Sequence, residues 1–307
     1  MSLLNMSKST STSKSTVALL VACLSGALPG VKPPPCAAQP VYLPTASGPS
    51  GSGTTAGEGA RRSVLLSVLD WESAAQRAMP AAAPPGWARE YDPSIRHGGE
   101  PQLRAAHGPE EPVRAGGWSA RFQLYKTDPV INHGTRAELS AGFEPVGAER
   151  WYGFSIYLPY TWVPDRAAEI VTQWHQHWAI GSSPPLAIQT HNGQWEISQN
   201  WEGYQADTPV GAYATGCWTD FVVHLKWSAG ADGVLDIYKD GVPVPGFYHK
   251  HGKNTYDDPR QGNYMKVGIY KWAWSQHRPS DTSRRVMYFD ALRVADEHGS
   301  YGAVAPR

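Results

Sequence analysis

Hydrophobic and polar residues alternate along many short stretches of this chain. A period of two is typical of β-strands that have one face in a core and the other face toward solvent or a ligand. The pattern predicts strands over residues 63–69, 119–125, 134–140, 151–158, 169–178, 186–191, 194–201, 220–227, 234–239, 264–272 and 286–294. Turn signals such as Asp240-Gly241 separate these stretches, and no long stretch has a helical period. We therefore predict an all-β fold, an antiparallel β-sandwich.

The stretch from Tyr264 to Trp272 has two chemically different faces. One face carries Tyr264, Lys266, Gly268, Tyr270 and Trp272, and the other carries Met265, Val267 and Ile269. A core strand rarely has a lysine and two tyrosines on one side, so we interpret this strand as the floor of an active site. Gly268 leaves a gap in the polar face, where a ligand or another backbone can approach closely.

Two other predicted strands have polar faces of the same kind. Residues 134–140 place on one face Arg136, Glu138 and Ser140. Residues 169–178 place together Gln173, His175 and His177. Gln189 and Asn200 on the neighbouring strands are further candidates for lining the groove.

The N-terminal region has the features of a leader followed by a spacer. Lys8 and Lys14 precede an apolar run at 17–23, as in a secretory signal peptide over residues 1–38. The segment 20–23 also matches a lipoprotein box, in which residues 1–22 leave and Cys23 becomes the lipid anchor. Residues 39–62 are rich in Pro, Gly, Ser and Thr and form a flexible linker to one domain at 63–307. We expect a secreted protein, or one that is lipid-anchored in the cell envelope.

Composition narrows the choice of partner. The chain has 27 Lys and Arg against 27 Asp and Glu and no long basic run, which argues against nucleic acid as a partner. The aromatic residues are mostly Trp (13) and Tyr (15) rather than Phe (6), and their polar edges suit stacking on sugar rings. Removal of the first 22 residues takes two lysines and no acid, which leaves 25 basic against 27 acidic residues, a charge of −2. This balance argues against a highly sulfated polyanion as the substrate.

Several common chemistries lack their motifs. Retaining glycosidases need two acids close together, and the chain has no Glu-x-Asp-x-x-Glu. A Gly-x-Ser-x-Gly nucleophile elbow is also missing. Cys23, Cys36 and Cys217 make neither a disulfide framework nor a metal-ligand cluster, so we expect no metal site and no required cofactor. A structural calcium ion has no recognisable liganding loop here. The remaining Arg, Gln, His, Lys and Tyr side chains suit proton abstraction beside a carboxylate.

The three polar stretches, in their order along the chain, carry a family resemblance. Arg136-Ala137-Glu138-Leu139, Gln173-Trp174-His175 and residues 264–270 resemble the jelly-roll polysaccharide lyases. The heparin lyase I-like family is most similar, followed by glucuronan lyases and one group of alginate lyases. The resemblance covers roughly residues 71–294, with further matches at 115–122, 149–159, 184–187, 218–224 and 288–290. It implies a jelly roll that cleaves a uronic-acid polymer by β-elimination.

The resemblance also implies roles for individual residues. Arg136 and Gln173 would stabilise the enolate-like charge at the uronate carboxylate. His175 would be the general base that removes the C5 proton. Tyr270 would protonate the leaving O4, or serve as both base and acid on the epimer that requires syn elimination. Lys266 lies four residues from Tyr270, roughly 13 Å along a strand, and would hold a neighbouring uronate.

Alternatives stay open at this point. His177 shares a face with His175 and is the second candidate for the base. Glu138, Gln189 and Asn200 are expected to bind substrate, whereas a glycoside hydrolase would have Glu138 and Glu196 as a dispersed acid pair. A non-catalytic lectin on the same fold is the rival from another class. We expect a monomer, and an acidic polysaccharide that is glucuronan-, alginate- or heparin-like; the absence of a basic run around the groove disfavours heparin.

Overall fold

The computed structural model describes residues 63–177, 179–181 and 183–307. The predicted signal peptide, the anchor candidate Cys23 and the linker at 39–62 lie outside these residues. No helix in the described part of the chain is long and apolar enough to cross a membrane.

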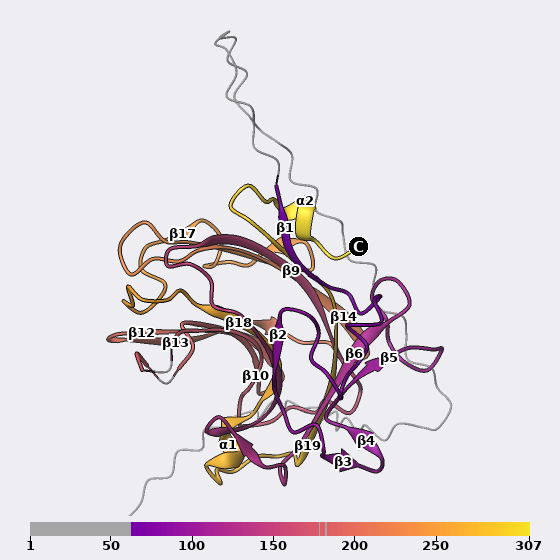
Figure 1. The fold of residues 1–307 in the computed structure, drawn as a ribbon. Coiled ribbons are helices and arrows are strands. Elements are labelled where there is room, and N and C mark those ends of the chain that lie inside the picture. Colours follow the sequence, from indigo (N-terminus) through magenta and orange to yellow (C-terminus); the bar gives the residue numbers. More distant parts are fainter. Residues whose placement is uncertain (1–62, 178, 182) are drawn as a thin grey trace, which may run out of the picture. The chain divides into compact units, whose positions relative to one another are not determined.

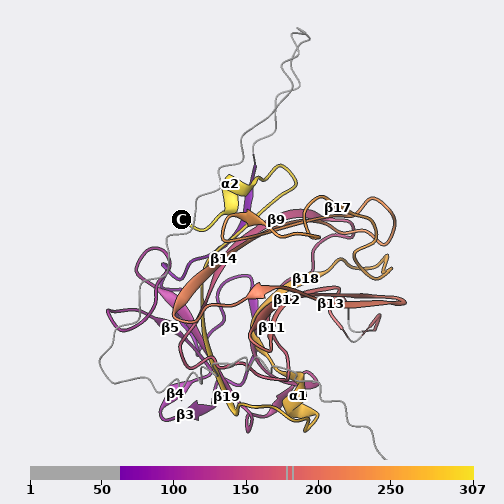
Figure 2. The ribbon, with the colours of Figure 1, turned by 180° about the vertical axis from the view of Figure 1, so that it is seen from behind.

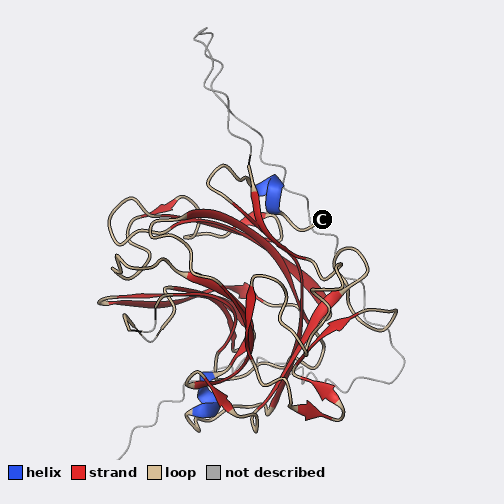
Figure 3. Ribbon diagram, viewed as in Figure 1, coloured by secondary structure: helices blue, strands red, loops and turns tan. Residues whose placement is uncertain are grey.

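Two antiparallel sheets form most of the regular structure (Figures 1 and 3). The first sheet has the strand order β16-β15-β14-β9-β19-β6-β5, with β1 beside β19 and β17 beside β15. Its strands are β1 (Leu65–Leu69), β5 (Leu103–Ala106), β6 (Ser119–Tyr125), β9 (Glu149–Leu158), β14 (Cys217–Lys226), β15 (Val234–Lys239), β16 (Val242–Pro243), β17 (Lys250–His251) and β19 (Arg284–Ala295).

The second sheet has the order β13-β12-β11-β10-β18-β8-β2, with β7 beside β8. Its strands are β2 (Trp87–Glu90), β7 (Val130–Ile131), β8 (Gly134–Ala141), β10 (Glu169–His175), β11 (Leu186–His191), β12 (Gln194–Trp201), β13 (Tyr204–Ala212) and β18 (Tyr264–Tyr270). The view from behind shows β11, β12, β13 and β18 together (Figure 2). The remaining elements are β3 (Arg96–His97), β4 (Glu100–Pro101), α1 (Trp272–Ser275) and α2 (Tyr301–Val304). The prediction of an all-β antiparallel sandwich is confirmed.

The core lies between the two sheets and is built from the apolar faces of alternating strands. Trp174 on β10 is fully buried, with its ring 5.1 Å from Tyr152 and 6.4 Å from Phe154, both on β9. Trp195 on β12 packs 5.2 Å from Phe221 on β14. Burial of a large apolar side chain contributes about 2 kcal/mol or more, so these contacts fix which face of the second sheet points outward.

Most predicted strands are present, with differences at their ends. The strand predicted to continue to residue 178 ends at His175, and the one predicted to reach Trp272 ends at Tyr270, where the chain enters α1. The Asp240-Gly241 turn joins β15 to β16 with positive φ at both residues, as a tight hairpin requires. β2, β5 and β13 were not predicted. β2 and β5 have four residues each, and the edge strand β13 contains a proline and is mostly exposed on both faces, so none of them has a clear alternating pattern.

An irregularity between β10 and β18 lies directly under the polar face. Their register shifts between Ile170 and Thr172, so that Ile170 pairs with Tyr270 and Gln173 pairs with Lys266. Gly268 lies in this bulge with φ of 132°, and a Cβ there would lie 2.2 Å from the carbonyl oxygen of Ala137 on β8. The glycine therefore admits a neighbouring backbone rather than a ligand, which was one of the two explanations expected from the sequence.

Candidate active site

A cavity of about 1000 Å³ opens on the outer face of the second sheet. Strands β8, β10, β11, β12, β13 and β18 contribute side chains to it, together with Glu90 at the end of β2 and residues after α1. Because neighbouring residues of a strand point to opposite faces, the same strands that fill the core with Ala137, Trp174 and Val267 present polar side chains here.

Most of the residues selected from the sequence meet in this cavity. Its lining includes Arg136, His175, Gln189, Asn200, Lys266 and Tyr270. Neither His177 nor Glu196 is among the lining residues. Gln173 and Glu138 are fully buried beneath the cavity, which differs from the expectation that both would face a substrate.

Arg136 and Lys266 share one carboxylate, that of Glu90. The Nη1 atom of Arg136 lies 3.0 Å from Oε2 of Glu90, and Nζ of Lys266 lies 2.8 Å from the same oxygen. All three side chains are less than 10% exposed, so the ion pairs are little screened by water. This shared carboxylate ties together β2, β8 and β18.

Gln173 and Glu138 support Arg136 from below. The Nη1 atom of Arg136 also lies 3.1 Å from Oε2 of Glu138, and Nε2 of Gln173 donates to the other oxygen of Glu138 at 2.6 Å. Nη2 of Arg136 donates to the carbonyl of Asn132 at 2.9 Å. The guanidinium is therefore held in one orientation, with its plane fixed by three partners.

The two carboxylates beside Arg136 have opposite pKa shifts. Burial raises the pKa of Glu138 above its usual value, against the opposing effect of Arg136 and Lys266. Burial also acts on Glu90, but Lys266 and Arg136 together lower its pKa below the usual value. The lowered pKa keeps Glu90 ionised between its two cations.

His175 is held in a tautomer that suits a base. Its Nδ1 lies 2.8 Å from the carbonyl oxygen of Gln176, so Nδ1 carries the proton and Nε2 keeps a lone pair. Burial, followed by the nearby charge of Lys266, lowers the pKa of His175 to about 4. The imidazole is therefore neutral at ordinary pH.

Tyr270, the last residue of β18, lies against Arg136. The Arg136 guanidinium carbon is 4.1 Å from the centre of the tyrosine ring. A Cβ at Gly134 would lie 2.2 Å from Cε2 of this ring, so only glycine leaves the ring its place. Burial raises the pKa of Tyr270, although Arg136 opposes the shift, and the phenol keeps its proton.

Sequence reasoning missed several lining residues. Glu90 was missed because β2 is too short for a visible pattern, and Asp207 because β13 is an exposed edge strand. Arg278 comes from the segment after α1, which has no periodic pattern. Tyr264 lies on the face identified from the sequence, and its ring centre is 5.8 Å from that of His175. The alternation of β18 was the signal that could have assigned Tyr264 to the cavity lining.

Metal binding has no support in the described part of the chain, where no group of three or more His, Cys, Asp or Glu side chains is placed to hold an ion.

Cys217, at the start of β14, is disulfide-bonded, which the cysteine count did not predict.

Comparison with known proteins identifies the family. The family model described as polysaccharide lyase matches residues 102–293, more than half of the chain. The chain belongs to this polysaccharide lyase family. No curated protein matches the lyase significantly in sequence.

Several solved structures are similar to the lyase to different degrees. An endo-β-1,4-glucuronan lyase from the fungus Trichoderma reesei is similar with a TM-score of 0.56 and 20% identity, covering 67% of this chain and 91% of its own. An alginate lyase from Pseudomonas aeruginosa has a TM-score of 0.41 and 16% identity, covering 58% and 82%. The catalytic domain of a glycoside hydrolase family 131 protein from Coprinopsis cinerea has a TM-score of 0.49 and 15% identity, covering 76% and 94%. At 20% identity the likeness to the glucuronan lyase concerns the fold, and it agrees with the jelly roll expected from the sequence.

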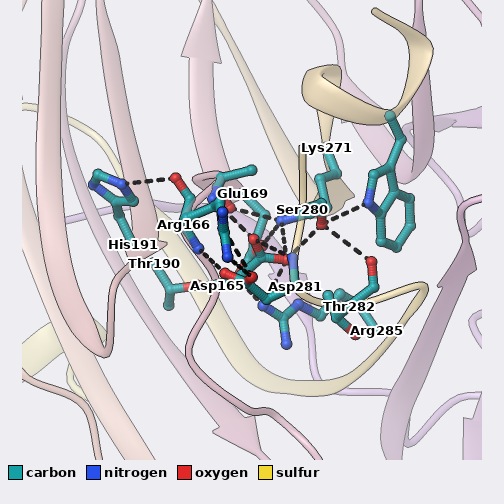
Figure 4. A network of polar contacts seen from close by, with 12 residues as sticks. Asp165, Arg166, Glu169, Thr190, His191, Lys271, Ser280, Asp281, Thr282 and Arg285 are labelled. Atoms are coloured by element: carbon teal, nitrogen blue, oxygen red, sulfur yellow. Dashed lines mark hydrogen bonds and ion pairs between the residues drawn. The ribbon is translucent and has the colours of Figure 1, made fainter. Parts of the chain in front are cut away.

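A second buried ion cluster surrounds Lys271, the residue after Tyr270, in the lyase (Figure 4). Lys271 is fully buried and bonds Glu169 and, at 3.2 Å, Asp165. Arg285 from β19 reaches Oε1 of Glu169 at 2.9 Å. The backbone N–H of Lys271 donates to the carbonyl of Thr135 at 3.0 Å. The cluster therefore joins the segment after β18 to β10, β8 and β19, and it holds the end of the strand that carries Tyr270.

Replacement of Lys271 tests this cluster. Lys271→Met leaves Glu169 and Asp165 buried with one cation fewer, so we expect the free energy of unfolding to fall by about 3 kcal/mol, measured by denaturant titration. Lys253 is the control, because it forms a surface pair with Glu202 at 2.8 Å and Lys253→Met is expected to cost under about 1 kcal/mol. Equal stability changes in the two variants would show that the buried cluster does not hold this strand end.

Proposed function

We propose that this polysaccharide lyase cleaves a uronic-acid-containing polysaccharide by β-elimination and produces 4,5-unsaturated uronate ends. The observation that carries the proposal is the convergence of a neutral histidine, a protonated tyrosine and two cations on one cavity. His175, Tyr270, Arg136 and Lys266 all line it. The glucuronan lyase of similar fold is in keeping with this substrate class.

The residues have complementary roles in this reaction. Arg136 and Lys266 attract the uronate carboxylate and stabilise the charge that develops on it when the C5 proton leaves. His175 takes that proton on Nε2. The C4–O4 bond then breaks as the C4=C5 double bond forms, and Tyr270 gives its proton to O4. On the epimer with the opposite geometry at C5, Tyr270 would act as both base and acid.

Residues around these four have supporting roles. Gln173 and Glu138 act on the substrate through Arg136, which they hold in place, rather than by direct contact. Gln189 and Asn200 bind sugar hydroxyls farther along the cavity. The basic and apolar segments at the start of the chain support export of the enzyme, in secreted form or with a lipid anchor at Cys23, and we propose that it acts as a monomer.

The reaction type and the acid are tested together. We expect the protein to release products with the ultraviolet absorbance of a 4,5-unsaturated uronate from at least one of glucuronan, alginate, heparan sulfate and heparin. Tyr270→Phe keeps the ring and removes the proton, and kcat on the active polymer should fall by at least about 100-fold. Tyr248, exposed and outside the cavity, provides the matched control Tyr248→Phe with unchanged kcat. Binding without turnover on every polymer would favour a lectin, and near-normal turnover of Tyr270→Phe would reject the assigned acid.

The acid limb of the pH profile tests the base. His175 must be neutral to accept a proton, and its folded-state pKa of about 4 lies below the usual 6.5. We therefore expect kcat/KM to stay high as pH falls through 6.5 and to be lost only near pH 4, since this parameter reports the free enzyme. His175→Asn should abolish turnover, whereas His177→Asn should retain it. An acid limb at pH 6.5 or above, or activity lost with His177 instead, contradicts the assignment.

A further inference from the structure

Charged side chains are distributed unevenly along the cavity. Three cations, Arg136, Lys266 and Arg278, enter it from β8, β18 and the segment after α1, and Glu90 is the one anion among the described lining residues at that end. The end formed by β11, β12 and β13 carries Gln189, Ser198, Asn200, Gln205 and Asp207. Among the described lining residues of that end, Asp207 is the one charged side chain, and it is an anion.

Hydrogen bonds at this end strengthen the contrast. The amide nitrogen of Gln189 lies 3.0 Å from Oε2 of Glu196 and 3.4 Å from Oδ1 of Asp207. Two carboxylates therefore share this neutral donor, and Glu196 also lies 3.0 Å from Nδ1 of His191, which is not a lining residue. Lys250 bonds Gln199 on β12 and Lys253 bonds Glu202 just after this strand, and neither lysine is among the lining residues of the cavity.

This polar end is far enough from His175 to hold a separate sugar. The strands follow the order β13-β12-β11-β10, and His175 ends β10. Neighbouring strands are about 4.8 Å apart, so β13 lies about 14 Å from β10 across the sheet. A polysaccharide that crosses these strands places the uronate to be cleaved near Arg136 and another ring of the chain against β11 to β13.

A second uronate would fit that place poorly. Its carboxylate would lie beside Asp207 with no described lining cation to balance the like charges, and repulsion of this kind is a common way to reject a wrong ligand. The hydroxyls of an uncharged sugar match the same surface, because amides and hydroxyls both donate and accept and a carboxylate accepts.

We propose that the β11 to β13 end of the cavity binds an uncharged sugar, so that the substrate is a heteropolymer in which neutral residues alternate with uronates. The inference rests on the proposed function and specifies its substrate. A polymer with a carboxylate on every ring is then a poor substrate.

Two polymers test this substrate class in the full-length protein. One is an unsulfated chain that alternates 4-linked glucuronate with an N-acetylhexosamine, and the other is glucuronan, a homopolymer of glucuronate. We expect kcat/KM, from the absorbance of unsaturated products, to be at least about tenfold higher on the alternating chain. If the wild-type enzyme cleaves glucuronan as fast as the alternating chain, or faster, this inference is wrong and the lyase proposal still stands. If none of the uronate polymers yields an unsaturated product, both this inference and the lyase proposal are wrong.

A matched pair of variants locates the effect. Asp207→Asn removes one negative charge from the cavity, and the ratio of kcat/KM on glucuronan to that on the alternating chain should rise about threefold or more. Thr208→Lys changes the net charge by the same amount on the neighbouring residue, which faces away from the cavity by strand alternation, and should leave the ratio unchanged. Both residues are exposed on an edge strand, so both variants should fold, as unfolding curves will show. An unchanged ratio in Asp207→Asn, or an equal rise in Thr208→Lys, contradicts the proposal.

Discussion

The carboxylate of Glu90 between Arg136 and Lys266 is the interaction on which the cavity depends. Two cations this deeply buried would repel each other and lose their hydration without an anion between them. Glu90 supplies it from β2, whereas the cations come from β8 and β18, so the ion pairs hold three strands in one register. Glu138 adds a second carboxylate below, 3.1 Å from Nη1 of Arg136. The site thus combines rigid placement with two cations that line the cavity.

The strand end that carries Tyr270 is held in two places. The ring lies against Arg136 and Gly134, and the Lys271 cluster holds the next residue. The bulge at Gly268 allows Ile170 to pair with Tyr270 while Gln173 pairs with Lys266. Irregular backbone, buried ions and a proton donor therefore occur within a few residues of one another. An enzyme gains from such rigidity because a group placed in advance needs no reorganisation during the reaction.

The sequence was most informative where strands alternate strongly. The alternation in β8, β10 and β18 predicted correctly that Arg136, His175, Lys266 and Tyr270 face one side. It could not reveal Glu90, because a four-residue strand has too few positions to show a period, nor the bulge, which depends on backbone pairing across the sheet. The sequence also could not show how deeply Gln173 is buried. Its face of the strand was predicted correctly, but its burial depends on the hydrogen bond to Glu138, which belongs to another strand. Charge over the whole chain was also a poor guide to the cavity, since a net charge of zero conceals a cationic end and an uncharged or acidic end.

The most direct test of β-elimination follows the oxygen atom of water. The reaction should be run in ¹⁸O-labelled water with the polymer that the enzyme cleaves, and the fresh products weighed by mass spectrometry. Elimination adds no water to the broken bond, so the account predicts fragments without ¹⁸O and with one unsaturated end at each cut. Fragments that carry one ¹⁸O atom per cut and no unsaturated end would mean hydrolysis, and they would contradict the roles given to His175 and Tyr270.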